Sequence, residues 1–213
     1  MEIRVLRRLE DRNQASADEI SAVLKKHEIR LINIMGGPGC GKTTLLEHLL
    51  PKLVDRFRCA VLEGDLYTTR DAERIAALQA PVVQLETQGS CHLDAALVLR
   101  GLKELPLDDL NVVFVENVGN LVCPANFDLG ETARIAVMSV TEGHEKPSKY
   151  PLVFSRAHAV VISKIDLLEH TNFDVAAAES DIRVVNADAP IFKFSHRDDV
   201  PQPLIDWIVS LST

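Results

Sequence analysis

The chain has 213 residues, which suits a single domain with a sizeable buried core. Its formal net charge is −8, from 23 basic and 31 acidic residues, so we expect neither nucleic acid nor an anionic membrane surface as a partner. No apolar run reaches the roughly 18–20 residues that span a bilayer, and the N-terminus lacks an apolar signal segment. We therefore expect a cytoplasmic protein, in which the four cysteines are core thiols or ligands rather than disulfides.

Predicted strands and helices alternate along the chain. In order, the elements are helix Ser16–His27, opened by a capping box at Ser16–Glu19, strand Leu31–Met35, helix Thr43–Val54, strand Ala60–Leu62, helix Asp71–Leu78, strand Val82–Leu85, helix His92–Leu105, strands Val112–Val115, Arg134–Val140 and Ala159–Ile162, a helix ending at Ile182, strand Ile191–Phe194 and helix Pro203–Leu211. This alternation predicts an α/β fold with a mostly parallel sheet and helices on both faces. We expect residues 1–30 to form a segment and helix that pack on a nucleotide-binding domain spanning residues 31–213.

A phosphate-binding loop is predicted between the first strand and the second helix. Gly36-Gly-Pro-Gly-Cys-Gly-Lys-Thr43 matches the full G-x-x-x-x-G-K-S/T pattern of the P-loop NTPases. Lys42 is expected to reach the β- and γ-phosphates, and the Thr43 hydroxyl to bind Mg²⁺. The residues expected to line the nucleotide site here are Gly37, Pro38, Gly39, Cys40, Gly41, Lys42, Thr43 and Thr44. The alternative is a glycine-rich turn that only joins a strand to a helix.

Two acidic residues follow predicted strands and are candidates for the Mg²⁺ site. They are Asp65 and Glu116, with Glu63 as a weaker candidate. Glu116 opens Glu-Asn-Val-Gly119, which stands where GTPases usually carry D-x-x-G, so the Gly119 N–H is expected to sense a γ-phosphate. Either acid could instead cap a helix or lie in a solvated loop. No glutamine is placed to orient water, so slow intrinsic hydrolysis is expected.

Ser163-Lys-Ile-Asp166 is similar to the guanine-reading N-K-x-D element. The Asp166 carboxylate would accept two hydrogen bonds from the N1–H and amino group of guanine, a donor pair that adenine lacks. The Lys164 side chain would stack along the base, whereas Ser163 in place of Asn puts one supporting contact in doubt. The alternative is an ordinary strand-to-helix turn capped by Asp166.

Cys91, His92 and Cys123 form a candidate metal site. Cys91 and His92 are adjacent at the start of a predicted helix, and Cys123 lies four residues beyond Gly119. Thiolate and imidazole suit Ni²⁺ or Zn²⁺, and three ligands leave a site for a second chain or solvent to complete. Spacing alone leaves open the alternative of buried free thiols and a capping histidine. Other histidines, including His196, are interpreted as surface or loop residues.

Together these residues resemble one family, the HypB-type nickel-incorporation GTPases of NiFe-hydrogenase maturation. The segments that carry the resemblance are Asn33–Thr44, Gly64–Ile75, Gly89–Ala95, Glu116–Gly130, Ser139–Pro151 and Ser163–Leu168. They cover most of the chain from Leu31 onward. The Cys91-His-Leu-Asp-Ala95 and Glu145-Lys-Pro-Ser-Lys-Tyr-Pro151 stretches are the more specific ones, because a P-loop alone does not separate families.

The resemblance implies a SIMIBI-type G domain that forms a GTP-dependent homodimer with Ni²⁺ or Zn²⁺ at its interface. The implied ligands are Cys91, His92 and Cys123, and the cofactors are GTP and Mg²⁺. It implies a role in delivering nickel to the hydrogenase large subunit with a small zinc-containing partner chaperone. Lys146 and Lys149 match basic positions near the family's dimer interface. The N-terminus has neither the Cys-rich motif nor the His-rich stretch of some members, so tight nickel loading there is not expected.

Three other interpretations compete with this one. A urease-accessory GTPase has the same fold, but typically shows Cys-Pro-His where this chain has Cys91-His92. A P-loop kinase would need an acceptor site and an Arg-rich lid. A metal-binding scaffold with a vestigial nucleotide site is disfavoured by the intact Gly41-Lys42-Thr43. Nucleotide preference and metal stoichiometry would separate all of them.

Overall fold

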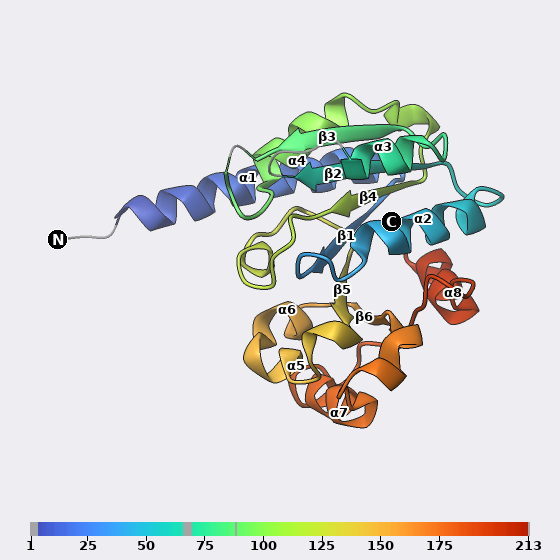
Figure 1. Ribbon diagram of the computed structural model, residues 1–213. Helices are drawn as coiled ribbons and strands as arrows, with labels where there is room; N and C mark the ends of the chain where they lie inside the picture. Colours follow the sequence, from blue (N-terminus) through green and yellow to red (C-terminus); the bar gives the residue numbers. More distant parts are fainter. Residues whose placement is uncertain (1–3, 66–69, 88, 213) are drawn as a thin grey trace.

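A single parallel β-sheet forms the centre of the fold (Figure 1). The computed structural model describes residues 4–65, 70–87 and 89–212, with side chains from residue 11 onward. Within these residues the strands are β1 (Arg30–Gly36), β2 (Cys59–Asp65), β3 (Val82–Glu86), β4 (Val112–Glu116), β5 (Ala133–Ser139), β6 (Ala159–Ser163) and β7 (Ile191–Lys193). They pair in the order β3-β2-β4-β1-β5-β6-β7, and every pairing between them is parallel. The predicted parallel sheet is thus confirmed.

Helices cover both faces of this sheet (Figure 1). They are α1 (Arg4–His27), α2 (Lys42–Leu53), α3 (Arg70–Ala76), α4 (Ala95–Lys103), α5 (Lys146–Lys149), α6 (Pro151–Ser155), α7 (Val175–Val185) and α8 (Gln202–Ser210). One core cluster joins α2, α3 and α8 to one face of the sheet, and two others join α1 with α4, and α6 with α7, to the opposite face. The strands at the centre are apolar on both faces because both are covered.

The first and fourth helices differ from their predicted bounds. Helix α1 begins at Arg4, so Ser16 lies inside it and the predicted capping box is wrong. The helix continues because Ala17, Ile20 and Leu24 share one face and are buried in the core that includes α4. Helix α4 begins at Ala95 rather than at His92.

The shorter α4 is explained by its cap. The Asp94 carboxylate accepts a 2.8 Å hydrogen bond from the Leu97 N–H, and Asp94 itself is extended. Cys91 and His92 therefore lie in the turn before the helix, not at its start.

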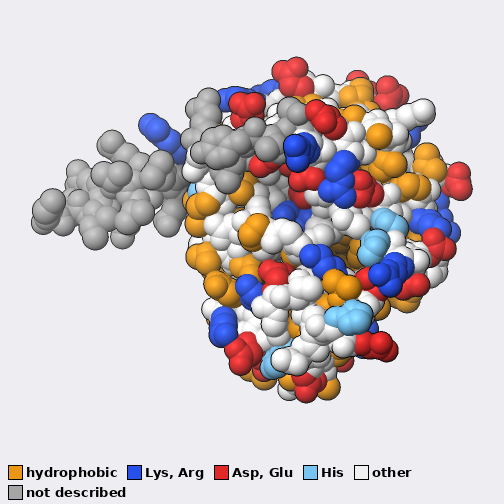
Figure 2. Space-filling view, viewed as in Figure 1, with side chains coloured by type: hydrophobic (Ala, Val, Ile, Leu, Met, Phe, Trp, Pro, Cys, Tyr) orange, Lys and Arg blue, Asp and Glu red, His pale blue; other side chains and the backbone are white. Residues whose placement is uncertain are grey.

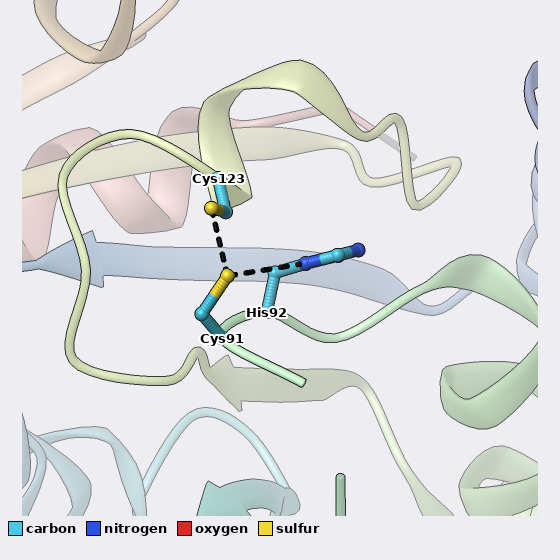
Figure 3. Close-up of side chains that lie close together, drawn as sticks. All are labelled: Cys91, His92 and Cys123. Carbon is cyan, nitrogen blue, oxygen red and sulfur yellow. Dashed lines mark hydrogen bonds between the residues drawn. The ribbon is translucent and has the colours of Figure 1, made fainter. Parts of the chain in front are cut away.

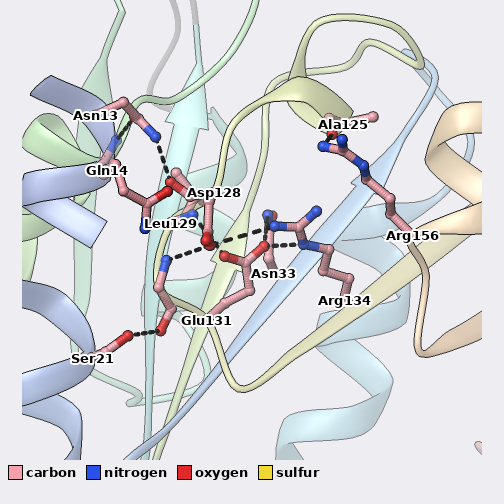
Figure 4. A network of polar contacts seen from close by, with 12 residues as sticks. Asn13, Gln14, Ser21, Asn33, Ala125, Asp128, Leu129, Glu131, Arg134 and Arg156 are labelled. Carbon is pink, nitrogen blue, oxygen red and sulfur yellow. Dashed lines mark hydrogen bonds and ion pairs between the residues drawn. The ribbon is translucent and has the colours of Figure 1, made fainter. Parts of the chain in front are cut away.

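Asn13 ties α1 to two other parts of the chain. Its side-chain oxygen accepts a 2.9 Å hydrogen bond from the Ala95 N–H, the first of α4, and its amide donates a 2.7 Å bond to the Asp128 carbonyl (Figure 4). The first N–H groups of a helix have no partner within the helix, so Asn13 supplies one from outside. Helix α1 thus holds both α4 and the loop that precedes β5.

The described residues include no helix that is both long and apolar enough to cross a membrane. On the face in Figure 2, acidic and basic side chains are interspersed.

Asn13→Ala is expected to lower the free energy of unfolding by about 1–2 kcal/mol, because it removes both hydrogen bonds and leaves the Ala95 N–H unpaired. Urea denaturation measures the effect. The matched control is Gln14→Ala, since among the described residues the Gln14 amide donates only to the exposed Asp18, one helical turn away. Equal stability of the two variants would show that the Asn13 contacts do not contribute.

Candidate functional site

The P-loop turns directly from β1 into α2. Gly39 and Gly41 have φ angles of 72° and 97°, which other residues rarely adopt, so the turn requires glycine at both positions. Gly41 precedes α2 without a side-chain cap, which leaves the first N–H groups of the helix available to an anion. Cys40 is fully buried, and burial raises the pKa of its thiol to about 11. The thiol is therefore neutral, and the backbone is the part of this residue that suits a phosphate.

Three carboxylates stand at the ends of β4 and β2, beside the P-loop. The Thr43 hydroxyl donates a 2.7 Å hydrogen bond to Glu116 Oε1, and the Lys42 ammonium lies 4.0 Å from the same oxygen. Glu63 is the register partner of Glu116, and Asp65, two residues further on, ends β2 with the same facing. Sequence reasoning ranked Glu63 below Asp65, yet Glu63 is only 2% exposed and sits at the centre of this cluster.

Burial, together with the negative charge of Glu116, raises the pKa of Glu63 to about 8. Burial also raises the pKa of Glu116 to about 7, although the Lys42 charge opposes this effect. One oxygen of each carboxylate accepts no hydrogen bond from the described part of the chain. The cluster therefore offers two buried carboxyl groups, each with an oxygen that can accept a further hydrogen bond or bind a cation, next to Lys42 of the P-loop.

A cavity of about 510 Å³ lies between the P-loop and the end of β6. The Lys164 ammonium donates a 2.6 Å hydrogen bond to the Gly39 carbonyl, and the Ser163 hydroxyl donates to the Cys40 carbonyl. Both contacts tie the predicted base-reading element to the P-loop, so Ser163 retains a supporting contact. Asp166 lines the cavity, and its two oxygens accept no hydrogen bond from any described residue.

Residues after β7 complete the wall of this cavity. Arg197 Nε and His196 Nδ1 lie 3.5 and 3.7 Å from Asp166. His196 is exposed in the turn after β7, as expected from sequence, and this turn borders the cavity. Phe194 and His48 line the same cavity, with ring centroids 5.5 Å apart, and Thr44 lines it at the start of α2. A cavity of this size with an unsatisfied carboxylate, cations and aromatic walls suits a planar polar ligand such as a nucleobase.

Cys91, His92 and Cys123 come together at the same end of the sheet (Figure 3). The two sulfurs are 2.7 Å apart, Cys91 Sγ is 3.9 Å from His92 Nδ1, and one ligand atom from each residue lies within 4.8 Å of the others. The His92 ring stacks on Phe127 at 3.8 Å, and burial lowers its pKa, which favours the neutral imidazole that binds metals. Contact with the Cys91 thiol raises the pKa of Cys123.

Sequence reasoning missed the residues that support these ligands. Ser90 Oγ lies 3.3 Å from His92 Nδ1, and the Asn120 amide donates a 3.3 Å hydrogen bond to the Cys91 carbonyl. No local pattern marks such contacts, because Asn120 and Cys91 are far apart in sequence. In the Gly64–Ile75 segment of the resemblance, Leu66 to Thr69 lie outside the described residues.

Gly119 packs directly against the P-loop. A Cβ atom at this position would lie 2.8 Å from the Pro38 Cα, so no side chain fits. The next residue, Asn120, donates a 2.9 Å backbone hydrogen bond to Gly36. Cys123 follows three residues later, so one short segment contacts both the P-loop and the metal-ligand cluster.

Comparison with known proteins identifies the family of the chain. Residues 30–193 match the family model described as "CobW/HypB/UreG, nucleotide-binding domain". The hydrogenase maturation factor HypB of Escherichia coli K12 is 45% identical over 87% of this chain, which spans 64% of that protein's length. The probable HypB of Methanocaldococcus jannaschii is 42% identical over 86% of this chain and 83% of its own length.

The crystal structure of Helicobacter pylori HypB in complex with nickel superposes on this fold with a TM-score of 0.87, at 36% identity over 95% of this chain and 98% of that one. The sequence comparison and the structural comparison thus both identify HypB proteins as relatives of this chain. The chain belongs to the HypB-type hydrogenase maturation factors of the CobW/HypB/UreG family.

Proposed function

We propose that this protein is a GTP-hydrolysing metallochaperone that helps to insert nickel into the large subunit of a NiFe-hydrogenase. In this proposal GTP-dependent dimerisation is coupled to metal binding at Cys91, His92 and Cys123. The observation that carries it is the position of this cluster, with all three ligand atoms within 4.8 Å and one ligand on the segment that packs against the P-loop. The names of the relatives, hydrogenase maturation factors and a nickel complex, support nickel as the cargo.

The P-loop and Lys42 would hold the phosphates of GTP, and Lys42 would offset the charge that develops on them during hydrolysis. Gly119, which packs against Pro38 of the P-loop, would donate its N–H to the γ-phosphate. Asp166 would read the base edge, with Lys164 alongside it. Because no described side chain is an obvious water-orienting glutamine, slow intrinsic turnover follows as part of the proposal.

The acidic cluster fits Mg²⁺. Hard divalent cations prefer oxygen ligands, and the Thr43 hydroxyl and the free oxygen of Glu116 are such ligands, with Asp65 at the end of the adjacent strand. When bound, the ion would supply charge neutralisation on the β- and γ-phosphate oxygens. Thr43, Asp65 and Glu116 are therefore the residues proposed to hold it.

A second copy of the chain is the partner proposed to complete the metal site. Three ligands per chain leave a tetrahedral ion one short, and Cys91 is exposed, so its sulfur is open to a neighbouring molecule. Lys146 and Lys149 lie on α5, beside a cavity of about 460 Å³ that also includes His144 and Phe173. They are proposed to lie near the dimer interface, and a small zinc-containing chaperone is proposed to act with the dimer.

GTP is expected to be turned over in preference to ATP, and Asp166→Asn is expected to lower kcat/KM for GTP by about 10- to 100-fold. The amide cannot accept both hydrogen bonds of guanine, and bonds to a charged group are each worth about 1.5–3 kcal/mol. Steady-state kinetics with both nucleotides measures this. Asp188→Asn, an exposed change outside the cavity, is the control. Equal turnover of ATP and GTP by the unmodified protein would refute guanine specificity.

Ni²⁺ and Zn²⁺ are expected to bind with different affinity in the GDP-bound and GTP-analogue-bound states, by about 5- to 150-fold, the usual range for linked sites. Linkage is reciprocal, so metal should change nucleotide affinity by the same factor.

Metal binding should also weaken as pH falls, because the thiols must lose protons and the pKa of Cys123 is raised. Isothermal titration gives the affinities, and sedimentation gives the dimer population.

Cys91→Ala and Cys123→Ala should each lose the metal site, whereas Cys59→Ala, a thiol at the opposite end of β2, should keep it. Full metal binding by both ligand variants would exclude this site. Identical metal affinity and dimer population in every nucleotide state would exclude the linkage.

Without nucleotide, the protein is expected to lose stability as pH rises from 5 to 8. The pKa of Glu63 is raised from 4.5 to about 8, so in this range the folded state holds a proton that the unfolded state releases. Glu63→Gln should reduce the loss by about 1–2 kcal/mol, because one pKa unit corresponds to about 1.4 kcal/mol and Glu116 shares the effect. Urea denaturation at both pH values tests this. The exposed Glu104→Gln is the control, and equal slopes for both variants would contradict the assignment.

A further inference from the structure

The residue after His92 is wedged between the two nucleotide-facing strand ends. Leu93 is fully buried, and a Cβ atom placed on Gly64, next to Asp65, would lie 2.8 Å from Leu93 Cδ1. Its backbone N–H donates a 3.2 Å hydrogen bond to the side chain of Asn117, the residue after Glu116. The Cys91-His92 turn therefore contacts both segments that carry the Mg²⁺-site acids.

Asn117 makes this connection through its side-chain oxygen, and its side-chain amide and backbone N–H are hydrogen-bonded as well. The side chain is 1% exposed, and its oxygen accepts from the Leu93 and Val118 N–H groups at 3.2 and 3.0 Å. Its amide donates 3.2 Å to the Asn33 side chain on β1, and its backbone N–H donates 3.0 Å to Ile34. A buried amide with all these bonds moves only together with its partners, because breaking them leaves unpaired polar groups.

Asn120 makes a second connection, three residues further on. Its backbone N–H donates to Gly36 at 2.9 Å, forming an antiparallel bridge to the start of the P-loop. Its side-chain amide donates 3.3 Å to the Cys91 carbonyl, and its side-chain oxygen accepts 2.8 Å from the Val122 N–H. One residue thus contacts the P-loop, the Cys91 turn and the turn that leads to Cys123.

The far end of the same segment is anchored. Asn33 donates 3.2 Å to the Glu131 carboxylate, which pairs with Arg134, and Asn13 of α1 donates to the Asp128 carbonyl (Figure 4). A shift of the backbone that begins at Gly119 cannot extend beyond Asp128 without breaking these hydrogen bonds. The backbone between Gly119 and Asp128 must therefore move instead, and Cys123 lies in this part.

We propose that Asn117 and Asn120 are positioning residues that transmit the nucleotide state from Gly119 to the Cys91-His92 turn and Cys123. This inference rests on the proposed linkage of GTP and metal binding. Asn117 crosses the carboxyl edge of the sheet, from the acidic cluster on the α2 face to the metal-ligand turn on the α4 face. Asn120 links the Cys91 carbonyl to the backbone beside Gly119, so a shift of Gly119 changes the spacing of the two thiols.

The test is the ratio of Ni²⁺ dissociation constants in the GDP-bound and GTP-analogue-bound protein, measured by isothermal titration. Asn117→Ala and Asn120→Ala are expected to bring this ratio to within about twofold of one, from the roughly 5- to 150-fold expected of the unmodified protein. The matched control is Asn126→Ala in the same loop. In the described part of the chain the Asn126 amide donates only to the Val122 carbonyl, at 3.1 Å, within the loop itself. This variant should keep the full ratio.

Thermal denaturation checks that each variant is folded. If Asn117→Ala does not fold, the test rests on Asn120→Ala, because Asn120 is half-exposed. A ratio of Ni²⁺ dissociation constants close to one in this variant supports the proposal, and the ratio of the unmodified protein overturns it. Weaker Ni²⁺ binding by the same factor in both nucleotide states would show that the asparagines only support the metal turn, and would overturn the proposal. A ratio of one in the unmodified protein would instead refute the proposed linkage itself, so the two failures are distinguishable.

Discussion

The arrangement of the whole site depends on the parallel pairing of β2, β4 and β1. Parallel strands place their carboxyl ends at one edge of the sheet, and the register sets Glu63 opposite Glu116 and Ile34 opposite Glu116. The P-loop leaves β1 at that edge, so Thr43 and Lys42 meet the carboxylate of Glu116 without any long connection. A shift in the pairing of β4 by one residue would turn Glu116 to the opposite face.

The same pairing brings the proposed nucleotide and metal sites to a few shared residues. Glu116 ends β4 facing α2, whereas Asn117 hydrogen-bonds Leu93 and Asn33 on the side of α1 and α4. Consecutive residues point to opposite faces here: Glu116 faces α2, where the nucleotide is proposed to bind, and Asn117 faces α4, where the metal is proposed to bind. The proposed coupling would therefore be short-range, since no distant element has to relay a movement.

The metal-ligand cluster combines a firmly held histidine with more open thiols. His92 is stacked on Phe127 and its turn is fastened by the buried Leu93, while Cys91 is exposed. Rigid support with an open coordination side suits a site that takes up and releases its ion, whereas a structural zinc site is closed by four protein ligands. The pKa of Cys123 is raised by its contact with the Cys91 thiol, so its proton is harder to remove when a metal binds.

Most elements of the fold, and the nucleotide residues, follow local patterns that are visible in the sequence. The apolar runs of β1, β4 and β6 mark buried parallel strands, and Gly36 to Thr43 marks the loop between β1 and α2, since only glycine tolerates its positive φ angles. The bounds of α1 and α4 did not follow from such patterns. Ser16 and His92 resemble helix starts, but burial of Ala17 against α4 and capping by Asp94 decide the actual ends.

The contacts that join the two sites were decided by the tertiary structure alone. Cys91 follows β3 and Cys123, 32 residues later, follows β4. The parallel order β3-β2-β4 places both segments at one edge of the sheet, where the two sulfurs are 2.7 Å apart. Sequence offered Asp65 and Glu116 as the acids and Glu63 only as a weaker candidate, whereas the structure buries Glu63 and pairs it with Glu116. Asn33, Asn117 and Asn120 have no motif of their own, because an amide gains its role from the partners that a fold presents to it. The sequence therefore determined which chemical groups are available, and the packing of the sheet edge determined which of them meet.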